Sequence, residues 1–164
     1  MFHLSLNQQG LPYPDPIHPI IVHFVIAMVF CSFVCDVLGY FAHKPRLFEV
    51  SFWNLIVAAI SIFLAVIFGQ FEAGLAEPQA EAQSTLSLHT VMGWSLAAFL
   101  VIITAWRFAM RHQSPLRVSP LYLGFTTLLS CLIFFQMMLG SQLVWVYGLH
   151  VEPVVEATRQ GLLK

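Results

Sequence analysis

The sequence predicts an all-α integral membrane protein, built as a four-helix up-and-down bundle. Hydrophobic residues make up 59% of the chain and charged residues 9%, and the mean hydropathy is +0.80. A soluble domain carries about 25% charged residues, so this composition argues against a soluble fold. The chain contains four apolar stretches long enough to cross a bilayer, which takes roughly 20 helical residues. Its 164 residues suffice for one compact bundle rather than two domains.

The predicted elements follow in order along the chain. Residues 1–16 form a polar head in which Pro12, Pro14 and Pro16 disfavour a continuous helix. The next part, residues 17–147, forms the transmembrane domain, and residues 148–164 form a short interfacial tail. Within the domain, apolar runs predict helices over about residues 17–41, 50–71, 86–108 and 121–147.

The distribution of charge predicts the orientation of the bundle. Five of the seven basic residues lie in or beside the connections after the first and third helices: Lys44, Arg46, Arg107, Arg111 and Arg117. Cytoplasmic connections carry an excess of Lys and Arg, so we expect these two connections to face the cytoplasm and both termini to face outward. Asp36 lies near the same end of the bundle, and we expect it to pair with Arg107 or Lys44 in a structural role.

The up-and-down threading gathers histidines at the opposite, outer end. His18 and His23 open the first helix, His89 opens the third, and His150 follows the fourth. Ionisable side chains at membrane depth are costly and are usually functional. His23 and His89 lie at depths that match to within about 5 Å. We therefore expect this pair to face each other and to hold haem b through two axial imidazoles.

Two further residues fit this haem hypothesis, and two other interpretations stay open. Gly93, one turn below His89, would leave room for the flat macrocycle. Glu72 is a candidate partner for the second nitrogen of a ligating imidazole. A zinc or copper site is the first alternative, with His23 and His89 as ligands and His18 or His150 completing the set. In the second, the histidines bind no cofactor and only hydrogen-bond headgroups, water or backbone.

The first helix also carries a resemblance to a known family. Residues 18–30, HPIIVHFVIAMVF, and residues 35–41, CDVLGYF, resemble the bacterial membrane family named domain of unknown function 2231 (DUF2231). The matching residues are His18, Pro19, His23, Phe24 and Asp36, together with His89 at the third helix. Many members have proline where this chain has Val25. The resemblance implies a four-helix protein of a bacterial inner membrane or an internal, thylakoid-like membrane, with haem binding suggested for some members.

Function is predicted less specifically than fold. The segments GLPYPDPIHPIIVHF and VWVYGLH resemble the corresponding segments of family members from photosynthetic bacteria. This resemblance implies an association with a respiratory or photosynthetic complex. Our leading hypothesis is a b-type, cytochrome-like protein that transfers electrons or assists such a complex. The alternative is a cofactor-free structural or assembly subunit, suggested by a stripe of small or polar residues on the second helix: Asn54, Ala58, Ser61, Ala65, Gly69 and Glu72. A metal-ion or proton transporter is a weaker alternative.

The sequence also argues against several partners and activities. It contains no nucleophile–base pair, phosphate-binding glycine loop or paired catalytic carboxylates, so we expect no enzyme acting on a soluble substrate. Net charge is −1, and without a basic stripe we expect no nucleic-acid partner. Membrane lipid is the expected surrounding. Self-association into a homo-oligomer is left open.

Overall fold

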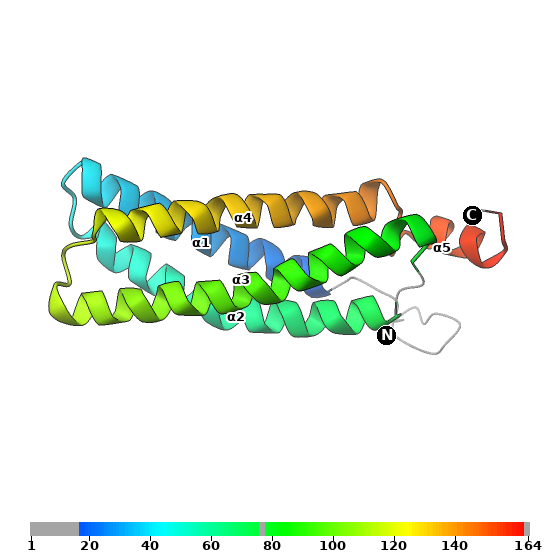
Figure 1. Ribbon diagram of the computed structural model, residues 1–164, viewed down its shortest axis with the longest axis horizontal. Coiled ribbons are helices and arrows are strands. Elements are labelled where there is room, and N and C mark those ends of the chain that lie inside the picture. The colour runs from blue at the N-terminus through cyan, green and yellow to red at the C-terminus, as the bar shows by residue number, and fades with distance from the viewer. Residues whose placement is uncertain (1–16, 76–77, 163–164) are drawn as a thin grey trace, which may run out of the picture.

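The computed structural model describes residues 17–75 and 78–162, which form a long four-helix bundle followed by a short fifth helix (Figure 1). The helices are α1 (Ile17–Phe41), α2 (Leu47–Leu75), α3 (Ala80–Gln113), α4 (Pro120–Trp145) and α5 (Glu152–Arg159). No strand occurs in these two described ranges, and the predicted all-α class is confirmed. The predicted polar head, residues 1–16, lies outside the described residues.

The four long helices run up and down, and each contacts two neighbours. α1 lies against α2 and α4, and α3 lies against the same two helices, so α1 and α3 are diagonal across the bundle. We call one end of the bundle the basic end; it holds the connections 42–46 and 114–119. The other end, which we call the histidine end, holds the start of α1, the connection between α2 and α3, and the end of α4 (Figure 1).

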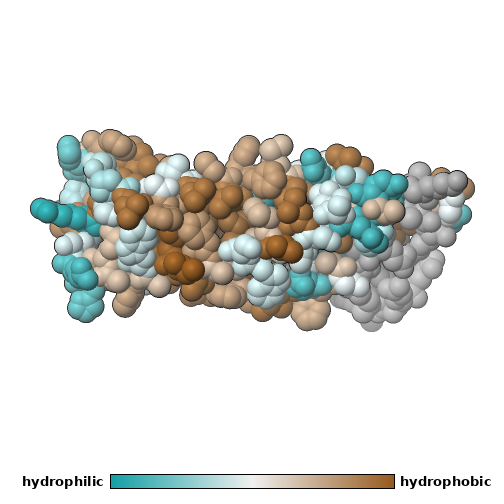
Figure 2. All heavy atoms as spheres, in the orientation of Figure 1, coloured by the Kyte–Doolittle hydropathy of each residue, from teal (hydrophilic) through white to brown (hydrophobic). Residues whose placement is uncertain are grey.

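The surface between these ends is apolar. Each of the helices α1 to α4 is long and apolar enough to cross a membrane. Figure 2 shows hydrophobic side chains over the middle of the bundle and hydrophilic ones gathered toward the ends. Large apolar side chains such as Ile60 and Phe134 are 63% and 58% exposed. Exposure of so many apolar groups is unfavourable in water but favourable in lipid, so the protein is an integral membrane protein.

Two of the helices extend beyond the apolar stretches that predicted them, whereas α1 has the predicted bounds and α4 covers Pro120–Trp145 rather than 121–147. α2 begins at Leu47 rather than 50 and ends at Leu75, and α3 covers Ala80–Gln113 rather than 86–108. The added turns contain polar and charged residues, which hydropathy assigns to connections although they continue the helix into the aqueous interface. The connection between α2 and α3 is correspondingly short, and the predicted interfacial tail contains α5.

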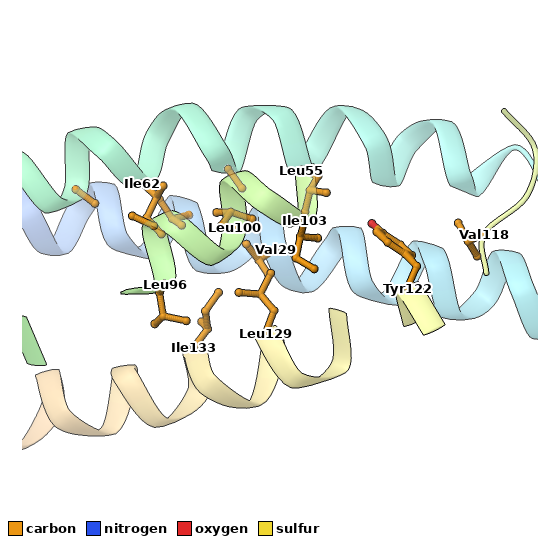
Figure 3. Packing of buried hydrophobic residues seen from close by; sticks show 14 of the residues in the cluster. Val29, Leu55, Ile62, Leu96, Leu100, Ile103, Val118, Tyr122, Leu129 and Ile133 are labelled. Atoms are coloured by element: carbon orange, nitrogen blue, oxygen red, sulfur yellow. The ribbon is translucent and has the colours of Figure 1, made fainter. Parts of the chain in front are cut away.

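The middle of the bundle is a continuous apolar core. Val29 of α1, Leu55 of α2, Leu100 of α3 and Leu129 of α4 are each no more than 2% exposed and pack around the bundle axis (Figure 3). Small residues bring the helices close together, because Ala58 and Ala97 are completely buried in the same cluster. Side chains from all four helices therefore fill the core of the bundle between the two polar ends.

A buried ion pair joins the helices near the basic end. Arg107 Nη2 lies 3.9 Å from Asp36 Oδ1, and both side chains are completely buried. The same guanidinium donates hydrogen bonds to two main-chain carbonyls, through Nη2 to Phe48 at 2.9 Å and through Nη1 to Arg117 at 3.3 Å. Arg107 thus ties α3 to α1, α2 and the connection 114–119. The predicted pairing of Asp36 with Arg107 is confirmed.

We expect Asp36→Asn to lower the free energy of unfolding by about 3–5 kcal/mol, because it leaves the Arg107 charge buried without a counter-charge. The measurement is a denaturant titration of the detergent-solubilised protein. A matched control is Glu49→Gln, which breaks the ion pair with Arg111, where the side chains are 41% and 35% exposed. We expect a much smaller loss there, because water solvates the remaining charge. Equal losses in the two variants would show that the buried pair has no special structural role.

Candidate histidine site

Four titratable side chains from separate segments meet at the histidine end. The His18 ring from α1 and the His89 ring from α3 have centroids 6.2 Å apart and planes at 86°, although their helices are diagonal in the bundle. Glu72, from the end of α2, accepts a hydrogen bond from the backbone N–H of His18 at 2.8 Å. His150, which follows α4, is close enough to Glu72 and His18 for their charges to act on it.

His18 is held by α2 in one orientation. Its Nδ1 lies 2.6 Å from the carbonyl oxygen of Ala65. A carbonyl can only accept, so Nδ1 carries the hydrogen, and Nε2 is the ring nitrogen that this contact leaves available. The bond from the His18 backbone to Glu72 satisfies one of the N–H groups that a helix start leaves without an intrahelical partner. A carboxylate there also complements the positive end of the α1 dipole.

His89 is partly buried, and its main chain is fixed by α4. Gln136 Nε2 donates a hydrogen bond to the backbone carbonyl of His89 at 2.8 Å. Among the described residues, the buried His89 Nδ1 has no hydrogen-bond partner, and neither has Gln136 Oε1. Buried polar atoms are nearly always paired in proteins, so an unpaired ring nitrogen indicates a site for a further ligand or an ordered water.

Two glycines provide the space that the rings occupy. A Cβ atom on Gly69 would lie only 2.8 Å from His18 Nδ1, and one on Gly140 would lie 3.2 Å from His89 Cε1. Each ring therefore packs against a bare helix backbone, that of α2 for His18 and that of α4 for His89. Gly69 belongs to the small-residue stripe predicted on the second helix. Because it has no side chain, the His18 ring can pack directly against the backbone of α2.

His150 joins this group from outside the membrane-spanning helices. Burial lowers the pKa of His150 from its usual value of 6.5, the Glu72 carboxylate acts in the opposite direction, and His18 adds to the lowering. Burial is the largest of these effects, so the ring is neutral at pH 7. A neutral imidazole has a nitrogen lone pair with which it can accept a proton or bind a metal.

The structure places two of the predicted site residues elsewhere. His23 does not face His89: its ring is exposed, and its Nδ1 lies next to the carbonyl of Pro19 one turn earlier. The reason is rotational, since five residues turn a helix by about 140°, which puts His18 and His23 on different faces. The space beside Gly93 is also not free for a macrocycle, because a Cβ there would meet Gln136 Nε2 at 3.5 Å.

The signal that selects His18 was present in the sequence. Asp36 follows His18 by 18 residues, which is five full helical turns, so the two share one face of α1. The buried residues Val25 and Val29 lie on the same face. The prediction compared the histidines by their depth in the membrane and not by their angular position on the helix. It therefore chose His23 instead of His18.

The histidines do not form a ready-made metal cage. Over residues 17–75 and 78–162, no group of three or more His, Cys, Asp or Glu side chains has the arrangement that a metal ion needs. Among these titratable groups, the rings of His18 and His89 contact each other, and the Glu72 carboxylate binds the start of α1. Paired imidazoles are therefore the chemistry that this end of the bundle offers.

We expect Gly69→Ala to destabilise the protein by about 1–3 kcal/mol, because the added methyl group forces the anchored His18 ring to move. Thermal unfolding in detergent measures the loss. Gly124→Ala is the matched control, since a Cβ at that helical position meets nothing within 4 Å. Alanine favours a helix more than glycine does, so the control variant should be at least as stable as the wild type. A stable Gly69→Ala variant would contradict the close seating of His18.

The chain was compared with known protein families, curated proteins and solved structures. A family model described as a predicted membrane protein (DUF2231) matches residues 14–153. No curated protein and no solved structure matches the chain.

Proposed function

The chain belongs to the DUF2231 family of predicted membrane proteins, and we propose that it binds haem b between His18 and His89 and serves as a small electron-transfer protein. The single observation that carries the proposal is the pairing of these rings across the bundle diagonal. His18 is held through Nδ1 with Nε2 free, and His89 has a buried ring nitrogen without a partner among the described residues. Four-helix bundles build cofactor sites from side chains that face each other in this way.

The spacing of the rings favours axial ligands over a compact metal cage. A metal bonded to imidazole nitrogen at about 2.0–2.1 Å lies roughly 3 Å from the ring centre. With ring centres 6.2 Å apart, His18 and His89 would be the two residues that hold the iron of a haem, which would supply one-electron chemistry. Neighbouring ligands of a tetrahedral zinc ion lie closer together. This distance ranks haem above zinc or copper.

The surrounding residues supply the support that ligating histidines need. Metal-binding histidines commonly donate their second N–H to a backbone carbonyl, which orients the ring and raises its basicity, and His18 makes this contact with Ala65. Gln136 holds the backbone at His89. A groove between α2 and α3, lined by Gln70, Ser87 and Thr90 among others, opens beside the site. Haem bound here would supply one-electron transfer.

The apolar middle of the bundle supports electron transfer over ion transport. Completely or almost completely buried side chains such as Leu55, Leu100 and Ile103 pack together in the middle of the bundle (Figure 3). Along α3, Leu100 and Ile103 lie between His89 and Arg107. A pathway for ions or protons needs polar groups or water across the membrane. The buried hydroxyls of the described bundle, such as those of Ser32, Thr104 and Ser130, donate to main-chain carbonyls, and no ionisable side chain is buried among these apolar residues, so we place the chemistry at the histidine end alone.

The test is an optical spectrum of the protein purified in mild detergent after expression with ample haem. We expect a reduced-minus-oxidised spectrum with a haem α-band, and loss of this band in both His18→Ala and His89→Ala. His23→Ala is the matched control: it removes a histidine from the same helix start, but from the exposed face, and should keep the band. Metal analysis of the same samples checks for zinc and copper.

Each alternative predicts a different result. A wild-type protein without haem or metal would exclude the proposal and favour a cofactor-free structural or assembly subunit. Loss of the band in His23→Ala, with the band intact in His18→Ala, would mean that the ligand pair is not the one that the bundle brings together. Stoichiometric zinc or copper without haem would favour the metal site.

We also propose that the basic end faces the cytoplasm, because Lys44, Arg46 and Arg117 lie in its two connections. Fusions of green fluorescent protein and alkaline phosphatase measure this. A phosphatase joined after the C-terminal residue should be active and the fluorescent protein dark, whereas fusions after Gln113 should give the reverse. The opposite pattern would place the histidine end in the cytoplasm.

A further inference from the structure

We propose that a groove at the basic end binds the phosphate headgroup of an anionic phospholipid. The groove lies where the end of α1 meets the start of α2 and the connection before α4. Its lining includes Tyr40, His43, Phe48, Leu116, Arg117 and Val118. The lining thus includes one cationic side chain, Arg117, and one titratable ring, His43, and the other named residues are aromatic or aliphatic.

The described residues give the basic end more cationic than anionic side chains. Its two acidic side chains are both engaged, Asp36 with Arg107 and Glu49 with Arg111. Three further cations, Lys44, Arg46 and Arg117, are exposed, and none forms an ion pair with a carboxylate of the described chain. Basic pockets between the ends of membrane helices are suited to anionic headgroups.

The level of the groove fits a lipid better than a free anion. α1 ends at Phe41 and α2 begins at Leu47, so the groove lies where the apolar helices pass into their polar connections. Phe41 and Leu116 are 72% and 55% exposed beside it and offer apolar surface to the glycerol and acyl chains. A guanidinium such as that of Arg117 binds phosphate oxygens through paired N–H groups. Inorganic phosphate would gain the charge contact but none of the apolar contact.

The walls of the groove are held in place before a lipid arrives. The buried Arg107 donates hydrogen bonds to the carbonyl oxygens of Phe48 and Arg117, one on each side of the groove. The Phe48 ring lies against Gly39, where an added Cβ would approach it to 2.7 Å. A site whose walls are already fixed loses little conformational freedom on binding, which favours affinity. The Arg117 side chain is left to the ligand, because its contact with Arg107 uses only the backbone oxygen.

The experiment is native mass spectrometry of the full chain released from nanodiscs that contain equal amounts of phosphatidylglycerol and phosphatidylcholine. We expect phosphatidylglycerol to be retained preferentially, and Arg117→Gln to reduce its retention about tenfold, as expected for the loss of a charge-assisted hydrogen bond. The matched control is Arg46→Gln, which removes the same charge from the same end at a residue that does not line the groove. This control should keep at least half of the wild-type retention.

Three results would overturn the proposal. Equal retention of the two lipids would show that the groove does not select an anionic headgroup. Equal effects of Arg46→Gln and Arg117→Gln would show general electrostatic attraction rather than a site. Displacement of phosphatidylglycerol by millimolar inorganic phosphate would identify a free anion as the ligand. A thermal unfolding curve of Arg117→Gln that matches the wild type ensures that the lost retention is not a folding defect, and none of these measurements depends on haem.

Discussion

The buried contact between Arg107 and Asp36 is the constraint on which the rest of the structure depends. A guanidinium inside a membrane bundle needs a counter-charge and hydrogen-bond acceptors. Here Asp36 supplies the counter-charge and two main-chain carbonyls accept from Nη1 and Nη2, whereas Nε has no hydrogen-bond partner among the described residues. Because Arg107 needs this counter-charge, the rotation of α1 about its own axis is fixed: only one face of the helix can present Asp36 to the bundle interior. His18 lies five full turns away on that same face. The pairing at the basic end therefore determines which histidine points inward at the other end.

This coupling separates what the sequence predicts from what it leaves undetermined. Hydropathy and length were enough for four spanning helices in up-and-down order, because both depend on single stretches of sequence. Asp36 was expected to pair with Arg107 or Lys44 because all three lie near the same end of the bundle, and in the structure Arg107 is the partner. The prediction paired His23 with His89 because it compared depth without rotation. In the structure the ring beside His89 is that of His18, and the spacing of His18 and Asp36 already placed these two residues on one face.

Other features of the site depend on relations between helices that a single sequence does not encode. Gly69 and Gly140 lie opposite the rings of His18 and His89 only because α2 and α4 pass the rings at those positions. Likewise, Gln136 reaches the backbone of His89 across the α3–α4 interface, 47 residues apart in the chain. A helix pays about 1 kcal/mol for each interior glycine relative to alanine, so these positions give up helix stability for space beside an imidazole. The reason for glycine at these two positions can therefore be recognised only from the packed bundle.

The same assembly changes how the small-residue stripe of α2 is understood. On the sequence alone, this stripe suggested a surface for docking onto a larger membrane complex. In the bundle, Ala58 and Ala65 are 0% and 3% exposed, Gly69 seats His18, and Glu72 binds the start of α1. The stripe is thus used within the chain, where it brings α2 close to its neighbours and holds His18 in place. An accessory subunit would have to dock through the lipid-facing sides of the bundle, so the stripe no longer argues for that role over a cofactor site.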